Sequence, residues 1–229
     1  MKSTRTAALW LIAVCMIASA RPASGQNVTT GTITGNYFVG GATLFEIANT
    51  PNATITGNQF YSSRSGAVYV IGRNGQPYLW NNNTYHGSTN RNVFGVTGDG
   101  IYQFASWKSM TGYDANSAAT SSVMPNTVIL RPNSYQAGRA NVMVYGVAGA
   151  TTASIDLSAS GLVNGQPYTI RNAQNYFGAP VATGTYNSAS PTVVVSLVGA
   201  AQSVATPLGY DYTPATTCPQ FCPMVVVPN

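Results

Sequence analysis

The amino-acid sequence predicts an all-β protein in which stacked coils are followed by an antiparallel β-sandwich. Three observations lead to this prediction. Charged residues make up only 7% of the 229 residues, whereas exposed helix faces are normally built from Glu, Lys and Arg. A six-residue pattern recurs near the amino end at an interval in the low twenties, which is typical of stacked repeats. Short β-rich runs separated by Gly, Pro and Asn turns then fill the second half.

Residues 1–25 have the features of a secretory signal peptide. Lys2 and Arg5 supply a positive start, Ala7–Ala18 is an apolar run of 12 residues, and small residues follow. This run is shorter than the roughly 20 residues of a membrane-spanning helix. We therefore expect a secreted protein, extracellular or periplasmic, with no membrane association after cleavage. An uncleaved anchor or a buried strand is the alternative interpretation of this segment.

The charge of the mature chain argues against two classes of partner. Lys2, Arg5 and Arg21 leave with the signal, so the net charge falls from +5 to +2. So small a charge gives no electrostatic case for binding nucleic acid or an anionic membrane.

Two cysteines, Cys218 and Cys222, remain in the mature chain with three residues between them. A local disulfide is the expected state in an oxidising compartment. A metal site is a weaker alternative, because two thiols without a neighbouring His or acid do not complete one. A redox-active pair is weaker still, because the thioredoxin-type motif has two intervening residues.

The repeat lies in the first mature segment. Ile33–Phe38 (ITGNYF) recurs as Ile55–Phe60 (ITGNQF), and Trp80–Tyr85 (WNNNTY) is a weaker copy. In each copy the asparagine and the aromatic residue are two positions apart, as residues on one face of a strand are. If the coils stack in register, like side chains form columns, with asparagines bonded to one another and rings stacked. The expected structural columns are Asn36, Asn58, Asn83 and Phe38, Phe60, Tyr85.

On this Ile-x-x-Asn-x-Phe motif, residues 28–100 resemble the right-handed parallel β-helix repeat proteins, the pectate-lyase-like architecture. The resemblance implies a short right-handed parallel β-helix over residues 26–100. Leucine-rich repeats have a similar period, but Leu44 and Leu79 are the only leucines in this region. Pectate lyases of this architecture use calcium held by several acids, and the repeats supply Glu46 alone, so no catalytic residue is carried over.

Residues 101–126 are expected to form a cap or linker. The spacing of apolar residues in Tyr102–Met110 predicts one short helix after the turn signal Gly98-Asp99-Gly100. A cap is needed because the last coil otherwise exposes an unpaired strand edge. The segment resembles the one that closes such β-helices. Four residues carry this resemblance: Trp107, Gly112, Asp114 and Ser117.

Residues 127–206 are predicted to form an antiparallel β-sandwich. The runs RPNSYQAGRANVMVY and NGQPYTIRNAQNYFG are similar to the β-sandwich tail of secreted β-helix and carbohydrate-active proteins. The Pro- and Thr-rich tail, residues 207–229, is expected to be a strap pinned by the disulfide, or a disordered end. The six predicted strands are Val128–Arg131, Asn141–Tyr145, Ala153–Leu157, Tyr168–Asn172, Pro180–Gly184 and Thr192–Val198.

The sequence offers little for catalysis, and we predict no catalytic residue, no cofactor and no metal. The five acids of the mature chain are all more than 14 residues apart, whereas glycoside hydrolysis needs two carboxylates on one bond; a fold could still bring them together. The only histidine, His86, is interpreted as an exposed turn residue, and a Ser-His-acid triad would have to use it. The acids are Glu46, Asp99, Asp114, Asp156 and Asp211.

Aromatic residues are the remaining binding candidates, because sugar rings stack on exposed aromatic faces. Tyr78 and Trp80 are the best placed, with Tyr61 third; structural stacking inside the coils is the alternative. We therefore predict a secreted, non-catalytic protein that recognises a polysaccharide or builds a surface assembly, with possible self-association through an uncapped first coil. The alternatives are a polysaccharide lyase or glycoside hydrolase, intact or truncated, and a purely structural or adhesive protein.

Overall fold

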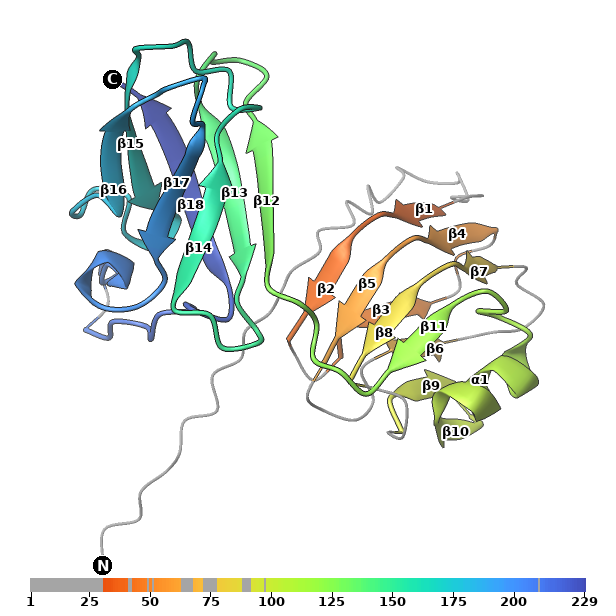
Figure 1. Ribbon diagram of the computed structural model, residues 1–229. Coiled ribbons are helices and arrows are strands. Elements are labelled where there is room, and N and C mark those ends of the chain that lie inside the picture. The colour runs from red at the N-terminus through yellow and green to blue at the C-terminus, as the bar shows by residue number, and fades with distance from the viewer. Residues whose placement is uncertain are drawn as a thin grey trace, which may run out of the picture. The chain divides into compact units, whose positions relative to one another are not determined.

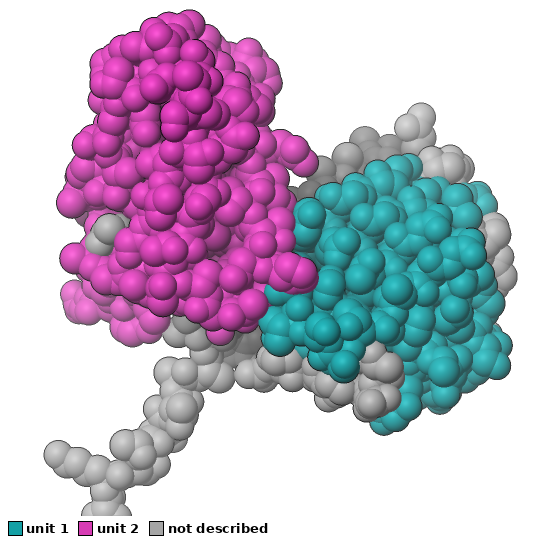
Figure 2. Space-filling view, viewed as in Figure 1, with its two compact units in different colours: residues 1–124 teal, residues 125–229 magenta. Residues whose placement is uncertain are grey.

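The computed structural model describes residues 31–40, 43–48, 50, 52–62, 68–71, 78–87, 92–96, 98–209 and 211–229. The chain divides into two compact units, residues 1–124 and residues 125–229 (Figure 2). Strands dominate both, which confirms the expected all-β class. The predicted signal peptide, residues 1–25, lies outside the described residues. Within the described part of the chain, no helix is long and apolar enough to cross a membrane.

The first unit is built from successive sets of three short strands. Every third strand pairs in parallel, which gives the sheets β1-β4-β7, β2-β5-β8 and β3-β6-β9 (Figure 1). The strands are β1 (Gly31–Thr34), β2 (Tyr37–Val39), β3 (Phe45–Ala48), β4 (Ala53–Thr56), β5 (Gln59–Tyr61), β6 (Val68–Ile71), β7 (Leu79–Asn81), β8 (Thr84–His86) and β9 (Phe94–Val96).

A left-handed residue ends the first strand of each set. Gly35, Gly57 and Asn82 have φ values of 66°, 68° and 55°. This region is open to glycine and tolerated by asparagine, because a larger Cβ group meets the carbonyl oxygen. Each of these residues comes immediately before an asparagine of the repeat, so the chain turns at the same point in each coil. The register then pairs Ile33 with Ile55, and Ile55 with Trp80.

Aromatic side chains fill the interior of the first unit. The Phe38 and Phe60 rings stack at 4.8 Å, and those of Phe60 and Tyr85 at 5.0 Å. These centroid distances match the separation of neighbouring strands, since each ring projects from the same position of its coil. Phe45 packs edge-on against Phe38, Phe60 and Trp80, so the interior is one continuous aromatic core.

The segment that follows β9 extends two of the three parallel sheets of the first unit. β10 (Gly100–Tyr102) pairs antiparallel with β9, and β11 (Ala118–Thr120) pairs parallel with β8. The helix α1 (Phe104–Thr111) lies between them and ends at Gly112, whose φ is 73°. It begins two residues later than predicted because Gln103 is extended. The fully buried Trp107 anchors α1 in the aromatic core.

The second unit contains a five-stranded antiparallel sheet, β12-β13-β18-β15-β16, and a two-stranded sheet, β14-β17 (Figure 1). Alternate residues of both sheets contribute to one apolar core, including Val142, Ile155, Ile170 and Val195. The strands are β12 (Thr127–Pro132), β13 (Ala140–Tyr145), β14 (Thr152–Asp156), β15 (Pro167–Asn172), β16 (Ala182–Thr185), β17 (Thr192–Ser196) and β18 (Cys222–Pro228).

The end of the chain departs from the prediction. The segment 207–229 was expected to be a strap or a disordered end, but β18 is the central strand of the five-stranded sheet. It pairs with β13 on one side and β15 on the other, and it buries Cys222, Met224 and Val226. Prolines at both ends of its apolar run concealed this strand. They are compatible with it because each lies near a strand end, Pro223 at the start and Pro228 at the finish.

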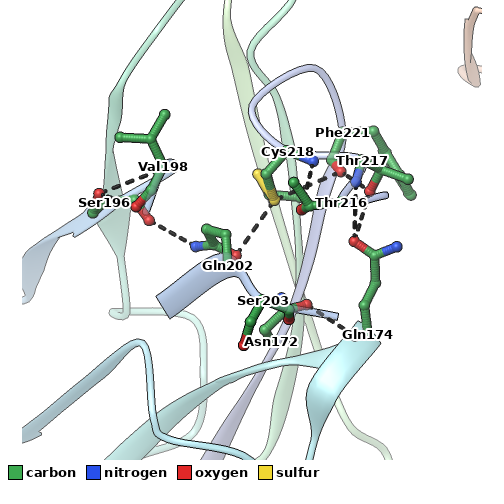
Figure 3. Close-up of a disulfide and its surroundings, with 11 residues drawn as sticks. Asn172, Gln174, Ser196, Val198, Gln202, Ser203, Thr216, Thr217, Cys218 and Phe221 are labelled. Atoms are coloured by element: carbon green, nitrogen blue, oxygen red, sulfur yellow. Dashed lines mark hydrogen bonds between the residues drawn. A yellow bond between two sulfur atoms is a disulfide. The ribbon is translucent and has the colours of Figure 1, made fainter. Parts of the chain in front are cut away.

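A strap leads into β18 (Figure 3), and its described residues, 203–209 and 211–217, contain no helix or strand. Cys218 and Cys222 form a disulfide at its end. Gln174 Oε1 accepts hydrogen bonds from the backbone and hydroxyl of Thr217, and Asn172 donates to the carbonyl of Ser203. The strap is therefore held at both ends, by Asn172 at the end of β15 and by Gln174 just after it.

Candidate functional site

The aromatic residues proposed as a sugar platform lie in the core of the first unit. Tyr78 is 7% exposed and Trp80 is 2% exposed. The indole of Trp80 donates to the hydroxyl of Tyr85 at 2.8 Å. Tyr61 is half-buried. The expectation of an exposed platform at Tyr78 and Trp80 is thus wrong, because Trp80 occupies the inward position that Ile33 and Ile55 occupy in the earlier coils.

The three asparagines of the repeat are joined by hydrogen bonds. Asn58 Oδ1 accepts from the backbone and side-chain amides of Asn36, at 2.9 and 3.1 Å. Asn83 Oδ1 accepts from the same two groups of Asn58 at the same distances. Asn58 Nδ2 and Asn83 Nδ2 also donate to the carbonyls of Ile33 and Ile55. The hydrogen bonds of the ladder all run in one direction, because each side-chain oxygen accepts from the preceding asparagine of the repeat.

Asp114 closes this ladder at its carboxyl end. Its carboxylate accepts from Asn83 Nδ2, the Tyr85 hydroxyl, the Trp107 indole and the Ser117 hydroxyl. Ser117 Oγ in turn accepts from the backbone amide of Asn83. The backbone amides of Asn36 and Asn58 donate to the side-chain oxygen of the next asparagine, so Ser117 occupies the position of a fourth asparagine. Asp114 is fully buried and has a φ of 59°. The cap residues Trp107, Asp114 and Ser117 therefore act together as the last rung.

Burial dominates the electrostatics of this cluster. Desolvation raises the pKa of Asp114, while the four donated hydrogen bonds oppose that rise. Desolvation, together with the nearby charge of Asp114, holds the pKa of Tyr85 well above its usual value. All four partners of Asp114 are donors, so the arrangement accommodates a carboxylate. Asp114 and three of its four partners are buried, which favours a structural role for the cluster.

We expect the free energy of unfolding to depend on pH through Asp114. The carboxyl group of Asp114 keeps its proton to a higher pH in the folded state than in the unfolded chain, where an aspartate side chain titrates near 4. The contribution to stability is therefore complete below about pH 4 and is lost as the pH rises through the raised pKa. Urea unfolding of the wild type and of Asp114→Asn across this range measures it. A constant difference between the two curves would contradict this assignment.

His86 lies in the wall of a small cavity, in contrast to the exposed turn that was expected. It is 9% exposed, and its Nε2 is 2.7 Å from Gln59 Oε1. Its Nδ1 is buried and has no hydrogen-bond partner among the described residues. Burial lowers the pKa of His86. The cavity is lined mostly by apolar side chains: Leu44, Phe60, Ser62, Val68, Tyr85 and Val93.

The five acids are dispersed. Glu46, Asp99, Asp156 and Asp211 are exposed, whereas Asp114 is buried. Among the described residues, no group of three His, Cys, Asp or Glu side chains could hold a metal ion.

A cluster of two arginines and a tyrosine on the second unit is the best-defined polar surface feature. The Tyr176 ring has the Arg139 guanidinium at 5.8 Å and the Arg171 guanidinium at 5.7 Å from its centroid. Arg139 Nη2 donates to the Tyr176 hydroxyl at 2.9 Å, and Arg171 Nη1 donates to the carbonyls of Tyr176 and Gly178. Cation–π contacts and hydrogen bonds thus hold the loop after β15 in one shape.

This clamped loop presents an aromatic ring to solvent. Phe177 is 95% exposed and packs edge-on against Tyr176, with 5.3 Å between ring centroids. In the neighbouring turn between β12 and β13, Tyr135 is 98% exposed. The next residue, Gln136, accepts from Arg139 Nη1, which ties that turn to the same cluster. We call Tyr135, Arg139, Arg171, Tyr176 and Phe177 the arginine–aromatic cluster.

Sequence reasoning missed the arginine–aromatic cluster. Its residues lie in two turns that are about 40 positions apart, and pairing of β13 and β15 with β18 brings those turns together. The available signal was an aromatic residue within each Asn-rich turn, NSY and NYF. Large aromatic side chains in turns are candidates for function, because turns lie on the surface.

Comparison with known proteins finds no matching family model, no similar curated protein and no similar solved structure.

Proposed function

We propose that this is a secreted, non-catalytic protein that recognises a polysaccharide through the arginine–aromatic cluster. The observation that carries the proposal is the exposure of Phe177 on a loop that Arg139 and Arg171 already hold in shape. Sugar rings stack on such faces, and a preformed loop loses little conformational entropy on binding. The signal-like residues 1–25 support secretion.

We further propose that the first unit is a short right-handed parallel β-helix and the second an antiparallel β-sandwich. Support for the β-helix comes from the three parallel sheets, the asparagine ladder and the stacked rings. Support for the sandwich comes from two antiparallel sheets that share one apolar core. In this arrangement the β-helix is a rigid carrier, and the sandwich presents the binding surface on its loops.

The test is a glycan array with the purified protein, followed by affinity measurement on the glycans retained. We expect binding without release of soluble sugar. Replacing both exposed rings, Phe177→Ala with Tyr135→Ala, should weaken binding about thirtyfold, because each of the two stacking contacts contributes on the order of 1 kcal/mol. Leu208→Ala is the matched control, since Leu208 is equally exposed but lies in the strap.

Three outcomes would contradict the proposal. Retention of no glycan would remove the recognition role and leave the structural or adhesive interpretation. Equal loss of affinity in Leu208→Ala would show that the two aromatic rings have no special part. Release of sugar from the array would show catalysis.

A further inference from the structure

We infer that the polysaccharide is acidic, and that its carboxylate or sulfate groups lie over a row of arginines on the outer face of the five-stranded sheet. This inference rests on the proposed function and adds the chemical class of the ligand. It follows from where the strand register places Arg131, Arg139 and Arg171.

The register places two of these arginines in one row. Arg131 on β12 pairs with Asn141 on β13, Asn141 pairs with Val225 on β18, and Val225 pairs with Arg171 on β15. Paired residues project from the same face of a sheet. The neighbours Leu130, Val142, Val226 and Ile170 belong to the core cluster or pack against it, so the row lies on the outer face. Strands are about 4.8 Å apart, so three steps separate Arg131 and Arg171 by roughly 14 Å.

Arg139 and Tyr176 extend this row into a surface. Arg139 immediately precedes β13, and its contacts with the Tyr176 ring and hydroxyl place it on the same side as Arg171. Because β18 lies between β13 and β15, the Tyr176 ring bridges the sheet between the two arginines. Asn141 is exposed within the row and adds an amide for sugar hydroxyls. The exposed ring of Phe177 stands beside this surface.

No ion pair among the described residues neutralises the positive charge of this face. None of the three arginines forms an ion pair with a carboxylate of the described residues. The second unit contains two acids, Asp156 and Asp211. Asp156 lies on β14 of the other sheet, and Asp211 lies in the strap.

The three guanidinium groups are not equivalent. Arg139 uses both terminal nitrogens to hold Gln136 and Tyr176, and Arg171 uses Nη1 on two backbone carbonyls. Arg131 is exposed, and no side-chain hydrogen bond to it is seen within the described residues. A guanidinium can bind a carboxylate or a sulfate through two hydrogen bonds, so Arg131 is the residue most available to an anionic group. Arg139 and Arg171 chiefly position Tyr176 and add to the local potential.

The experiment compares one glycan in charged and neutral forms. A uronic-acid oligosaccharide and its fully methyl-esterified form are titrated into the full protein, together with a sulfated neutral oligosaccharide. We expect esterification to weaken binding about tenfold, and affinity for the acidic form to fall with increasing salt. Arg131→Gln should weaken binding of the acidic form about two- to fivefold, as for an exposed ion pair, and leave binding of the ester unchanged. Binding of the sulfated oligosaccharide would show that either anion suffices.

Lys108→Gln is the matched control, because it removes a positive charge from α1 of the first unit and should leave every affinity unchanged. Equal affinity for the acid and its ester would overturn this inference and leave the proposed function standing. An effect of Lys108→Gln as large as that of Arg131→Gln would also overturn this inference and leave the proposed function standing. If the protein binds none of the glycans on the array, the proposed function itself is wrong.

Discussion

At neutral pH, Asp114→Asn should unfold the first unit at a lower denaturant concentration, with a loss of about 1–3 kcal/mol in the free energy of unfolding, because the unsatisfied hydrogen bonds cost more than is regained by no longer burying a charge. The carboxylate accepts from four donors, and an asparagine amide turns one of its two oxygens into a donor. Trp107 Nε1 and Asn83 Nδ2 donate to different oxygens of the carboxylate, and neither nitrogen can accept a hydrogen bond. Whichever way the amide is oriented, a buried donor then faces another buried donor, which is costly.

Urea unfolding followed by the fluorescence of the buried Trp80 and Trp107 measures this loss. Asp99→Asn is the control, since Asp99 is exposed in a turn and its side chain carries no comparable network. We expect this control to stay within about 0.5 kcal/mol of the wild type. Equal stability of Asp114→Asn and the wild type would show that the cap does not depend on the carboxylate.

Asn58→Ala, as a separate variant, should lower the free energy of unfolding by about 2–4 kcal/mol. Asn58 is fully buried in the middle of the ladder. Its removal leaves the backbone amide of Asn36 without its acceptor and the carbonyl of Ile33 without its donor. The alanine also leaves a small void between two coils, which adds to the loss.

The matched control is Asn36→Ala at the first rung of the same ladder. Asn36 is exposed, and after its removal Asn58 Oδ1 still accepts from the backbone amide of residue 36. We expect this control to cost less than about 1 kcal/mol. Thermal and urea denaturation of both variants provides the comparison. Similar losses at the two positions would mean that burial within the ladder has no energetic consequence.

The sequence alone indicated most of the first unit, because its information is local and repeated. The pattern Ile-x-x-Asn-x-Phe places an apolar, a polar and an aromatic residue at fixed points of each coil, so aligning its copies predicts which residues are neighbours. The hydrogen bonds between Asn36, Asn58 and Asn83 and the stacking of Phe38 on Phe60 follow that alignment. The burial of Trp80 follows the same alignment, because Trp80 pairs with Ile55, and the prediction of an exposed platform overlooked this.

The second unit was harder to predict because its contacts join distant parts of the chain. The six predicted runs each contain a strand, yet the seventh, β18, was missed, since prolines flank its valines and no repeat marks it. Only the tertiary structure could place β18 at the centre of the sheet. Its position there determines which turns meet, and hence the arginine–aromatic cluster.

By itself, the sequence determined the β-strand content and the repeat with its columns of like residues. These features depend on alternation, spacing and turn residues, which act over a few positions. The tertiary structure decided which aromatic rings are buried, where the last strand inserts and which arginines share a face. These depend on pairing between strands far apart in the chain, which local physical preferences do not specify.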